Sequence, residues 1–175
     1  MSTRKFLLAG MIVFAAGVIF VFVFRQQYAV SIPRPVEARR APDIILKNYE
    51  DNDVAFSDFQ GKVLLVNAWA SWCPFCVKEL SDFVKIQREF SDTIVVIAVN
   101  RAETQETARQ FSDRVNVTGK LIMLFDPGDS FYQSIGGFSM PETIFVDKKG
   151  FIRGHKRGPM KFEEIKRKVE DTLAF

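Results

Sequence analysis

The stretch from Val63 to Leu80 constrains the fold of this chain most, because it holds the only two cysteines, Cys73 and Cys76. Its first half is a continuous apolar run, VLLVNAWA, which is typical of a strand buried on both faces of a sheet. Its second half has the apolar spacing of a helix. The pattern therefore places a Cys-x-x-Cys pair at the point where a central strand turns into a helix.

This position predicts redox chemistry. The free N–H groups and the partial positive charge at a helix start stabilise a thiolate, the form that attacks a disulfide. We expect Cys73 to be the exposed nucleophile and Cys76, one turn further along, to resolve the mixed disulfide. Pro74 suits the first helical turn, where its missing N–H costs little. The alternatives are a static disulfide and half of a zinc site, but zinc needs about four ligands and the only histidine is His155.

Several motifs resemble the thioredoxin superfamily, and within it the membrane-anchored thiol-disulfide oxidoreductases of the TlpA/ResA/CcmG (DsbE) group. The motifs are APDIILKN before the cysteines, SDFQGKVLLVNAWASWCPFC around them, GGFSMPETIFVDKKG downstream, and Glu79 three residues after Cys76. The resemblance covers nearly everything from Ala41 to the C-terminus. It implies a thioredoxin-like α/β fold, in which helices flank a central mixed β-sheet, with an N-terminal β-hairpin and a central insertion at residues 101–125.

The N-terminal fifth predicts one transmembrane helix before this fold. Residues 6–24 carry no charged or strongly polar side chain, and as a helix they would be about 28 Å long, close to the ~30 Å hydrocarbon core of a bilayer. A cleaved signal peptide is the alternative, but its apolar run is usually only about 7 to 15 residues. We therefore divide the chain into a cytoplasmic stub (1–5), a transmembrane signal anchor (6–24), a linker (25–41) and a thioredoxin-like domain (42–175).

Charge does not orient this anchor, because Arg4 and Lys5 precede it and several arginines follow it. The resemblance implies a single pass through the bacterial inner (cytoplasmic) membrane, with the catalytic domain on the periplasmic or extracytoplasmic side. The lack of further cysteines suits an oxidising compartment. The formal net charge of +3 is mild, and the basic residues of 148–168 alternate with apolar ones, so we expect solvated faces and no nucleic-acid partner.

The periodicity downstream of the linker predicts strands, helices and two hairpins. We expect a first hairpin from Asp43–Lys47 and Asp53–Phe56, buried strands at Thr93–Asn100 and Leu121–Phe125, and a last hairpin from Glu142–Asp147 and Phe151–His155. We expect helices at Pro74–Phe90, Glu103–Val115, Ser130–Ser134 and Lys161–Leu173.

Met140-Pro141 is the second chemical landmark. The resemblance implies that this bond is cis, that it lies beside the cysteines, and that the backbone of Met140 offers strand-like hydrogen bonds to an incoming peptide. Gly136, Gly137 and Phe138 would line the same groove. A plain loop before a strand is the alternative. The residues that we assign to substrate binding are Trp72, Pro74, Phe75, Met140, Pro141 and Glu142.

Two carboxylates complete the predicted site. Glu79, on the helical turn after Cys76, is near enough to exchange a proton with that thiol, so we count it as catalytic with the two cysteines. Glu142 matches a position that is acidic in the cytochrome-maturation members of the group. Both would oppose a nearby thiolate. The alternative for each is an exposed helix or loop charge.

The departures from thioredoxin also bear on proton handling. Asn67 stands six residues before Cys73, where thioredoxin has a buried aspartate, which leaves Glu79 as the candidate proton carrier. Phe75 has no charge, so the motif lacks the imidazolium that stabilises a thiolate in a DsbA-like oxidant. We expect His155 to be an exposed hairpin residue and not a catalyst, because it lies far from the motif in the inferred sheet order.

The sequence thus predicts a protein disulfide reductase that needs no cofactor beyond its own cysteine pair. The resemblance implies apocytochrome c as the substrate and a transmembrane thiol-disulfide transporter as the electron donor. A general cell-envelope reductase, isomerase or oxidant is an alternative, because the direction of electron flow depends on the reduction potential. A tethered binding module that holds a thiol-containing partner without turnover is another. A peroxidase is disfavoured, since the chain lacks the Pro-x-x-x-Thr-x-x-Cys context.

Overall fold

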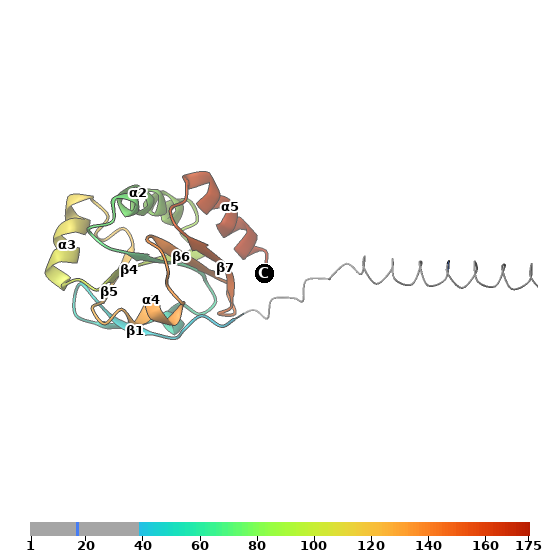
Figure 1. Cartoon of the computed structure of the whole chain (residues 1–175), viewed down its shortest axis with the longest axis horizontal. Coiled ribbons are helices and arrows are strands. Elements are labelled where there is room, and N and C mark those ends of the chain that lie inside the picture. The colour runs from blue at the N-terminus through green and yellow to red at the C-terminus, as the bar shows by residue number, and fades with distance from the viewer. Residues whose placement is uncertain (1–16, 18–38) are drawn as a thin grey trace, which may run out of the picture. The chain divides into compact units, whose positions relative to one another are not determined.

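A computed structural model of the chain describes residue 17 and residues 39–175 (Figure 1). Apart from residue 17, the predicted stub, anchor and linker up to residue 38 lie outside the described residues. Within the part that is described, no helix is long and apolar enough to cross a membrane. The folded domain lies within residues 39–175.

The described domain is built on one mixed sheet with the strand order β2-β1-β5-β4-β3-β6-β7. The central strands β3, β4 and β5 are parallel, whereas β1, β2, β6 and β7 pair antiparallel with their neighbours. The predicted mixed sheet and its parallel centre are thus confirmed. The strands are β1 (Ile45–Asn48), β2 (Asp53–Ala55), β3 (Val63–Trp69), β4 (Ile94–Arg101), β5 (Ile122–Asp126), β6 (Glu142–Val146) and β7 (Ile152–Arg157).

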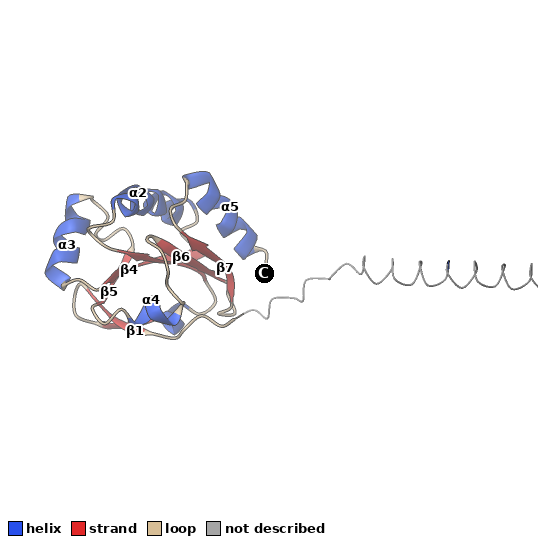
Figure 2. Cartoon of the chain, in the orientation of Figure 1, coloured by secondary structure: helices blue, strands red, loops and turns tan. Residues whose placement is uncertain are grey.

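Helices cover both faces of this sheet (Figure 2). One face packs against α2 (Pro74–Glu89), α3 (Gln105–Arg114) and α5 (Phe162–Leu173), and the other against α4 (Ser130–Ser134) and the 3-10 helix η1 (Phe56–Phe59). The predicted N-terminal hairpin is β1–β2, and the predicted insertion contains α3 and most of β5. Every predicted helix and strand is present, with ends that differ by at most two residues.

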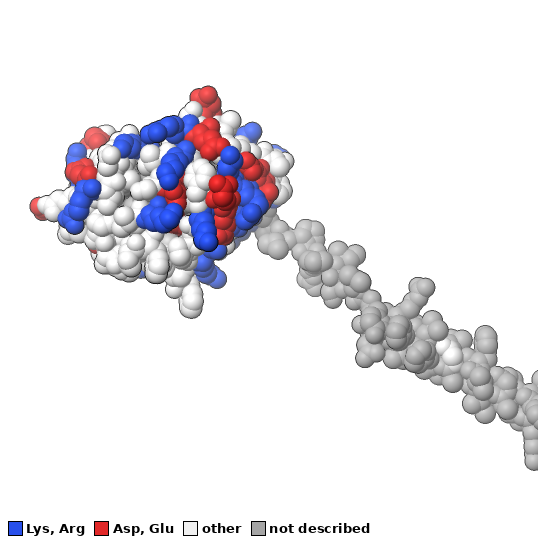
Figure 3. Space-filling view, turned by 90° about the horizontal axis from the view of Figure 1, so that it is seen from above, with Lys and Arg blue, Asp and Glu red and all other residues white. Residues whose placement is uncertain are grey.

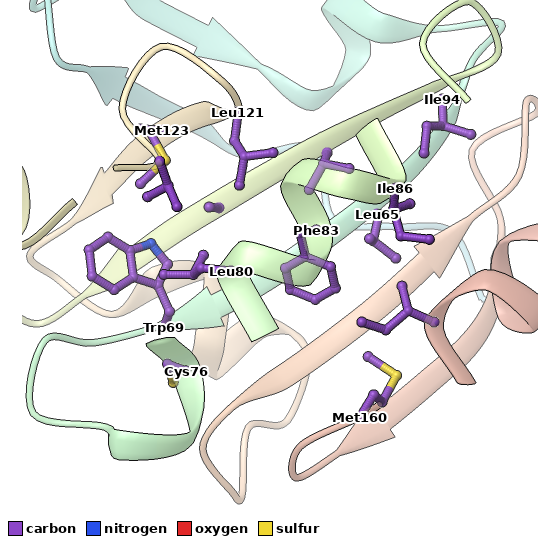
Figure 4. Close-up of a cluster of buried hydrophobic side chains, with 14 of the residues drawn as sticks. Leu65, Trp69, Cys76, Leu80, Phe83, Ile86, Ile94, Leu121, Met123 and Met160 are labelled. Carbon is purple, nitrogen blue, oxygen red and sulfur yellow. The ribbon is translucent and has the colours of Figure 1, made fainter. Parts of the chain in front are cut away.

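The central strand β3 explains how one apolar run serves two cores. All seven of its residues are buried. Because side chains alternate across a strand, Leu65 and Trp69 point into the cluster beneath α2, whereas Leu64 and Val66 point to the α4 side. Figure 4 shows the first cluster, in which Leu80 and Phe83 of α2 lie over Leu65 and Trp69 of the strand. This packing fixes the start of α2 at the end of β3.

The last residues of the predicted linker belong to the folded domain. Arg40 forms a β-bridge with Phe151, the N–H of Ala41 donates to the carbonyl of Gly150 at 2.9 Å, and the N–H of Ile152 donates to the carbonyl of Arg39 at 2.8 Å. The linker therefore ends earlier than the boundary at residue 41. The apolar pattern missed this segment because backbone pairing needs no apolar side chains.

Charges of both signs alternate on the surface. On the face seen in Figure 3, Lys and Arg are interspersed with Asp and Glu. Several ion pairs involve the basic C-terminal segment; in two of them, Lys156 lies 2.8 Å from Glu164 and Lys166 lies 2.5 Å from Glu89. This arrangement fits the predicted solvated faces, and surface pairs of this kind add little stability.

Candidate active site

A Cys73–Cys76 disulfide lies at the start of α2, where the sequence places it. Cys73 is the N-cap residue, Pro74 is the first residue of the helix, and the Cα atoms of the two cysteines are 5.4 Å apart. The expectation of an exposed Cys73 is wrong for this oxidised state. Cys73 is 2% exposed and Cys76 is 0% exposed, because both residues pack into the core cluster beneath the helix.

Large apolar side chains are exposed beside the cysteines in the sequence and in the loop before β6. Trp72 is 61% exposed and Phe75 is 60% exposed, and both are sequence neighbours of the cysteines. Phe138, in the loop before β6, is 83% exposed. Exposed aromatic side chains that gather near a reactive group are typical of a surface that binds a partner.

The loop before β6 contains the second predicted landmark. The Met140–Pro141 peptide bond is cis, as the resemblance implied. Among the described residues, the backbone N–H and C=O of Met140 have no hydrogen-bond partner. Both groups are therefore free to pair with an extended peptide.

Tyr132 of α4 supports this loop from beneath. Its hydroxyl donates to the carbonyl of Ser139 at 3.0 Å. Its ring also lies so close to Gly137 that a Cβ atom there would be 2.4 Å from the ring carbons, so only glycine fits. Arg101 of β4 stacks on the same ring, with its guanidinium carbon 3.6 Å from the centroid. The Tyr132 side chain thus packs against the loop and holds it in place.

Glu142, the first residue of β6, is a buried anchor for the same loop. Its side chain is 0% exposed, which excludes the alternative of an exposed loop charge. Oε2 accepts hydrogen bonds from the N–H groups of Phe138 at 2.8 Å and Ser139 at 3.1 Å. Oε1 lies 2.6 Å from Nε2 of His155 and 3.2 Å from Nε of Arg157. Burial alone would raise the pKa of Glu142, but these donors hold the pKa below its ordinary value.

His155 lies on the predicted hairpin but is not isolated from the site. Its side chain is 26% exposed, and it contacts Glu142, the residue that directly follows Pro141. This contact could not be predicted from the sequence, because a register shift separates Val146↔Ile152 from the pairs nearer the site, including Glu142↔Arg157. Without that irregularity, Lys156 would stand opposite Glu142, and a slip of one residue exchanges the two faces of a strand.

Glu79 is buried in a different setting. It is 1% exposed, so it is not an exposed helix charge either. Oε1 accepts a hydrogen bond from the N–H of Met160 at 2.9 Å, and Oε2 accepts one from Nδ2 of Asn67 at 3.2 Å. Burial raises the pKa of Glu79 to about 8, although both hydrogen bonds act to lower it. Neither of its hydrogen-bond donors carries a charge.

Asn67 connects Glu79 to β6. It is 0% exposed on β3, and its Nδ2 also donates to Oγ1 of Thr143 at 2.9 Å. A neutral amide here, in place of the aspartate of thioredoxin, leaves Glu79 as the titratable group of this buried cluster. From Asn67 the sequence predicted only that Glu79 is the candidate proton carrier. The contacts with Thr143 and Met160 could not be predicted, because both join segments far apart in the chain.

The cysteine pair follows β3 and the cis-proline precedes β6, so both stand at the same end of two neighbouring strands of a mixed sheet. This arrangement defines the class of thioredoxin-like thiol-disulfide oxidoreductases. Comparison with known proteins leads to the same class. Residues 37–173 match the Redoxin family, and the chain belongs to this family.

The chain is similar to proteins that exchange thiols and disulfides. It is 30% identical to the thioredoxin-like protein YneN of Bacillus subtilis, over 77% of this chain and 79% of the relative. It is also 30% identical to the thiol:disulfide interchange protein DsbE of Allochromatium vinosum, over 93% and 89%. A solved Chlorobium tepidum structure, provisionally assigned as a DsbE, superposes with a TM-score of 0.72 at 26% identity, covering 78% of this chain and 96% of that one. The chain is thus a thiol-disulfide oxidoreductase of the DsbE/CcmG/ResA type.

Proposed function

We propose that this chain is a membrane-tethered reductase that reduces a disulfide in apocytochrome c during cytochrome c maturation. The observation that carries the proposed thiol-disulfide exchange is the Cys73–Cys76 pair at the start of α2, with the buried Glu79 three residues further along the same helix. Burial raises the pKa of Glu79 to about 8, close to that of an ordinary thiol, about 8.5. A group of this kind can take the proton that Cys76 must lose. The family resemblance supports apocytochrome c, with its haem-attachment CxxCH cysteines, as the substrate.

The first step forms a mixed disulfide at Cys73. The Cys73 thiolate, stabilised by the positive end of α2, attacks one sulfur of the substrate disulfide. The substrate S–S bond breaks, a new bond joins Cys73 to the substrate, and the released substrate thiolate takes up a proton.

The second step releases the substrate. Cys76 gives its proton to the Glu79 carboxylate, and its thiolate attacks the sulfur of Cys73. The mixed disulfide breaks, and the second substrate sulfur leaves as a thiolate that takes up a proton. Two electrons and two protons have then passed to the substrate, and the Cys73–Cys76 disulfide remains. A transmembrane thiol-disulfide transporter would supply the two electrons that reduce it again.

The surroundings of the disulfide suit an extended peptide substrate. Trp72, Phe75 and Phe138 offer apolar contacts to residues that flank the target cysteine. The free N–H and C=O of Met140 can add a short strand-like pairing. This pairing would hold the substrate sulfur in line for attack by Cys73.

Turnover of a substrate disulfide tests this proposal against a binding module. The purified full-length chain should reduce the disulfide of a CxxCH peptide with dithiothreitol as the electron donor. Cys73→Ser should abolish turnover, and Cys76→Ser should accumulate a mixed disulfide between Cys73 and the peptide. Binding of the peptide by the wild type without any reduction would contradict the enzyme and favour the binding module.

The reduction potential decides the direction of electron flow. We expect equilibration with glutathione or dithiothreitol buffers to give a value near or below about −270 mV, which suits a reductant with a dedicated donor. A value near about −120 mV would instead make the chain an oxidant.

The apolar run at residues 6–24 supports the tether. We expect the full chain to fractionate with the inner membrane, and a chain that lacks residues 2–24 to be released from it. Protease added outside the cytoplasmic membrane should digest the domain. Protection of the domain would contradict its extracytoplasmic placement.

A further inference from the structure

The loop that carries the cysteines meets a second loop at the edge of the sheet. Strands β3 and β4 are parallel neighbours, and their last paired residues are Trp69 and Asn100. The loops that follow the two strands therefore leave the sheet side by side. One loop contains Ser71, two residues before Cys73, and the other contains Glu103.

The carboxylate of Glu103 joins these loops. Oε2 accepts a hydrogen bond from the backbone N–H of Ser71 at 2.8 Å, and Oε1 accepts one from the Ser71 hydroxyl at 2.5 Å. The buried Asn100 donates from Nδ2 to Oε2 at 2.7 Å. The backbone segment Ala70–Cys73 has one hydrogen bond of its own, from the N–H of Cys73 to the carbonyl of Ala70 at 3.1 Å. Glu103 contributes two more.

The backbone beside Glu103 supports a fixed placement of this side chain. Ala102 has a φ of 54°, in the left-handed region that a residue with a Cβ atom rarely adopts. Its N–H donates to the carbonyl of Asp126 at 2.9 Å. Strained residues of this kind persist where surrounding contacts hold them, often at functional sites. Here the strained residue directly precedes the carboxylate that contacts the active-site turn.

We propose that Glu103 is a positioning residue, whose carboxylate holds the Ala70–Cys73 turn and thereby places the Cys73 sulfur at the start of α2. The inference rests on the proposed function, in which Cys73 is the nucleophile. Glu103 affects Cys73 in two opposite ways. As an anion it opposes a nearby thiolate, whereas as a clamp it keeps the sulfur where the helix stabilises that thiolate. Removal of the side chain distinguishes the two effects, because loss of the charge would lower the pKa of the Cys73 thiol and loss of the clamp would raise it.

Alkylation of the reduced full-length chain by iodoacetamide shows directly whether the pKa of the Cys73 thiol rises or falls. The rate at Cys73, followed against pH by mass spectrometry, gives both the reactivity and the pKa of the thiol. For Glu103→Ala we expect the rate at neutral pH to fall about tenfold, because a Cys73 sulfur displaced from the start of α2 loses the stabilisation of its thiolate, which is the form that reacts. We expect the pKa of the Cys73 thiol to rise in the same variant.

Three further variants distinguish a contact from a charge. Glu103→Gln removes the charge but can still accept from the N–H of Ser71 and donate to its hydroxyl, so it should retain most of the wild-type rate. Ser71→Ala should also lower the alkylation rate, but by less than Glu103→Ala does. The double variant should react at the same rate as Glu103→Ala alone. The control is Glu106→Ala, which removes a nearby charge whose side chain accepts from Gln110, and it should match the wild type.

Several results would overturn the proposal. A rate for Glu103→Ala equal to that of Glu106→Ala would show that the contact does not matter, and a faster rate would show that Glu103 acts only as a charge. Additive losses from Ser71→Ala and Glu103→Ala would show that the two residues act separately. If circular dichroism shows that Glu103→Ala is unfolded, Ser71→Ala decides: a slower rate supports the clamp and an unchanged rate overturns it. Alkylation needs no disulfide substrate, so its result is independent of failed turnover.

Discussion

Glu79 and Glu142 are two buried carboxylates beside the same redox site, and their surroundings are opposite. Glu79 accepts hydrogen bonds from two neutral groups, and burial raises its pKa to about 8. Glu142 accepts from two backbone amides and from the side chains of His155 and Arg157, and its pKa is lowered. Burial acts to raise the pKa of both carboxyl groups, and the number and charge of the donors decide whether that effect is offset.

This difference separates two roles in one site. A carboxyl group with a pKa near 8 can exchange a proton with a thiol at little cost in free energy. A carboxylate held by four donors stays charged and keeps the loop before Pro141 in place. In the proposed mechanism Glu79 would therefore be the proton carrier, whereas Glu142 holds the loop before β6.

The two roles predict opposite effects of pH on stability, and this is the largest effect expected. Between its ordinary pKa of 4.5 and its folded pKa of about 8, Glu79 keeps a proton that it loses on unfolding. Its contribution to stability is fully present below pH 4.5 and is lost as the pH rises through 8. Glu142 has a lowered pKa, so its contribution is present above pH 4.5 and is lost as the pH falls through its folded pKa.

Urea unfolding of the oxidised protein at several pH values tests this pair of signs. From about pH 5 to pH 9, the wild type should lose a few kcal/mol relative to Glu79→Gln, since each tenfold change in proton affinity is worth about 1.4 kcal/mol. Parallel pH profiles for the two proteins would contradict a raised pKa for Glu79.

Replacement of Glu79 should also slow the release of substrate. In Glu79→Gln we expect resolution of the mixed disulfide by Cys76 to slow by about 100-fold near neutral pH, because the base is missing. The measurement is the decay of the mixed disulfide after rapid mixing with an oxidised peptide. Glu89→Gln, at the far end of the same helix, is the matched control. Equal decay in Glu79→Gln and the wild type would assign the proton to another acceptor.

Removal of the anchor should destabilise the fold without this kinetic signature. Glu142→Ala leaves the amides of Phe138 and Ser139 and the side chains of His155 and Arg157 without their acceptor, so we expect a loss of about 2 to 3 kcal/mol in urea unfolding. Glu142→Gln retains an acceptor oxygen and should lose less. A loss below about 0.5 kcal/mol in Glu142→Ala would mean that these contacts do not hold the loop.

The smallest effect should come from His155. In His155→Gln the new side chain can still donate to Glu142, and Arg157 remains, so we expect a loss of at most about 1 kcal/mol in the same unfolding experiment. A loss of unfolding free energy as large as that in Glu142→Ala would show that the His155 imidazole, and not the Glu142 carboxylate, holds the loop.

The sequence predicted the parts of this site that follow from local pattern. The apolar run of β3, the helix that starts at Pro74 and the cysteine pair between them depend on neighbours in the chain and were all found. The cis bond at Pro141 was found only through the family resemblance. The strand and the helix were predictable because strand and helix periodicity, and a proline at a helix start, depend only on residues close together in the sequence.

The contacts that give the carboxylates their roles were not predictable in the same way. The N–H of Met160 reaches Glu79 across 81 positions of the sequence. The pairing of Glu142 with His155 and Arg157 depends on the irregularity in the β6–β7 register, which no apolar pattern specifies. Glu103 meets Ser71 only because β3 and β4 are adjacent in the sheet. Such contacts require the tertiary fold before they can be read.

Direct titration of the two carboxyl groups tests the central claim. The oxidised full-length chain, labelled with ¹³C at the glutamate side-chain carboxyl carbons, would be followed by NMR across the pH range, with Glu79→Gln and Glu142→Gln used to assign the signals. We expect Glu79 to titrate near pH 8 and Glu142 to titrate below pH 4.5. A Glu79 signal that titrates near 4.5 would contradict the assignment of Glu79 as the proton carrier.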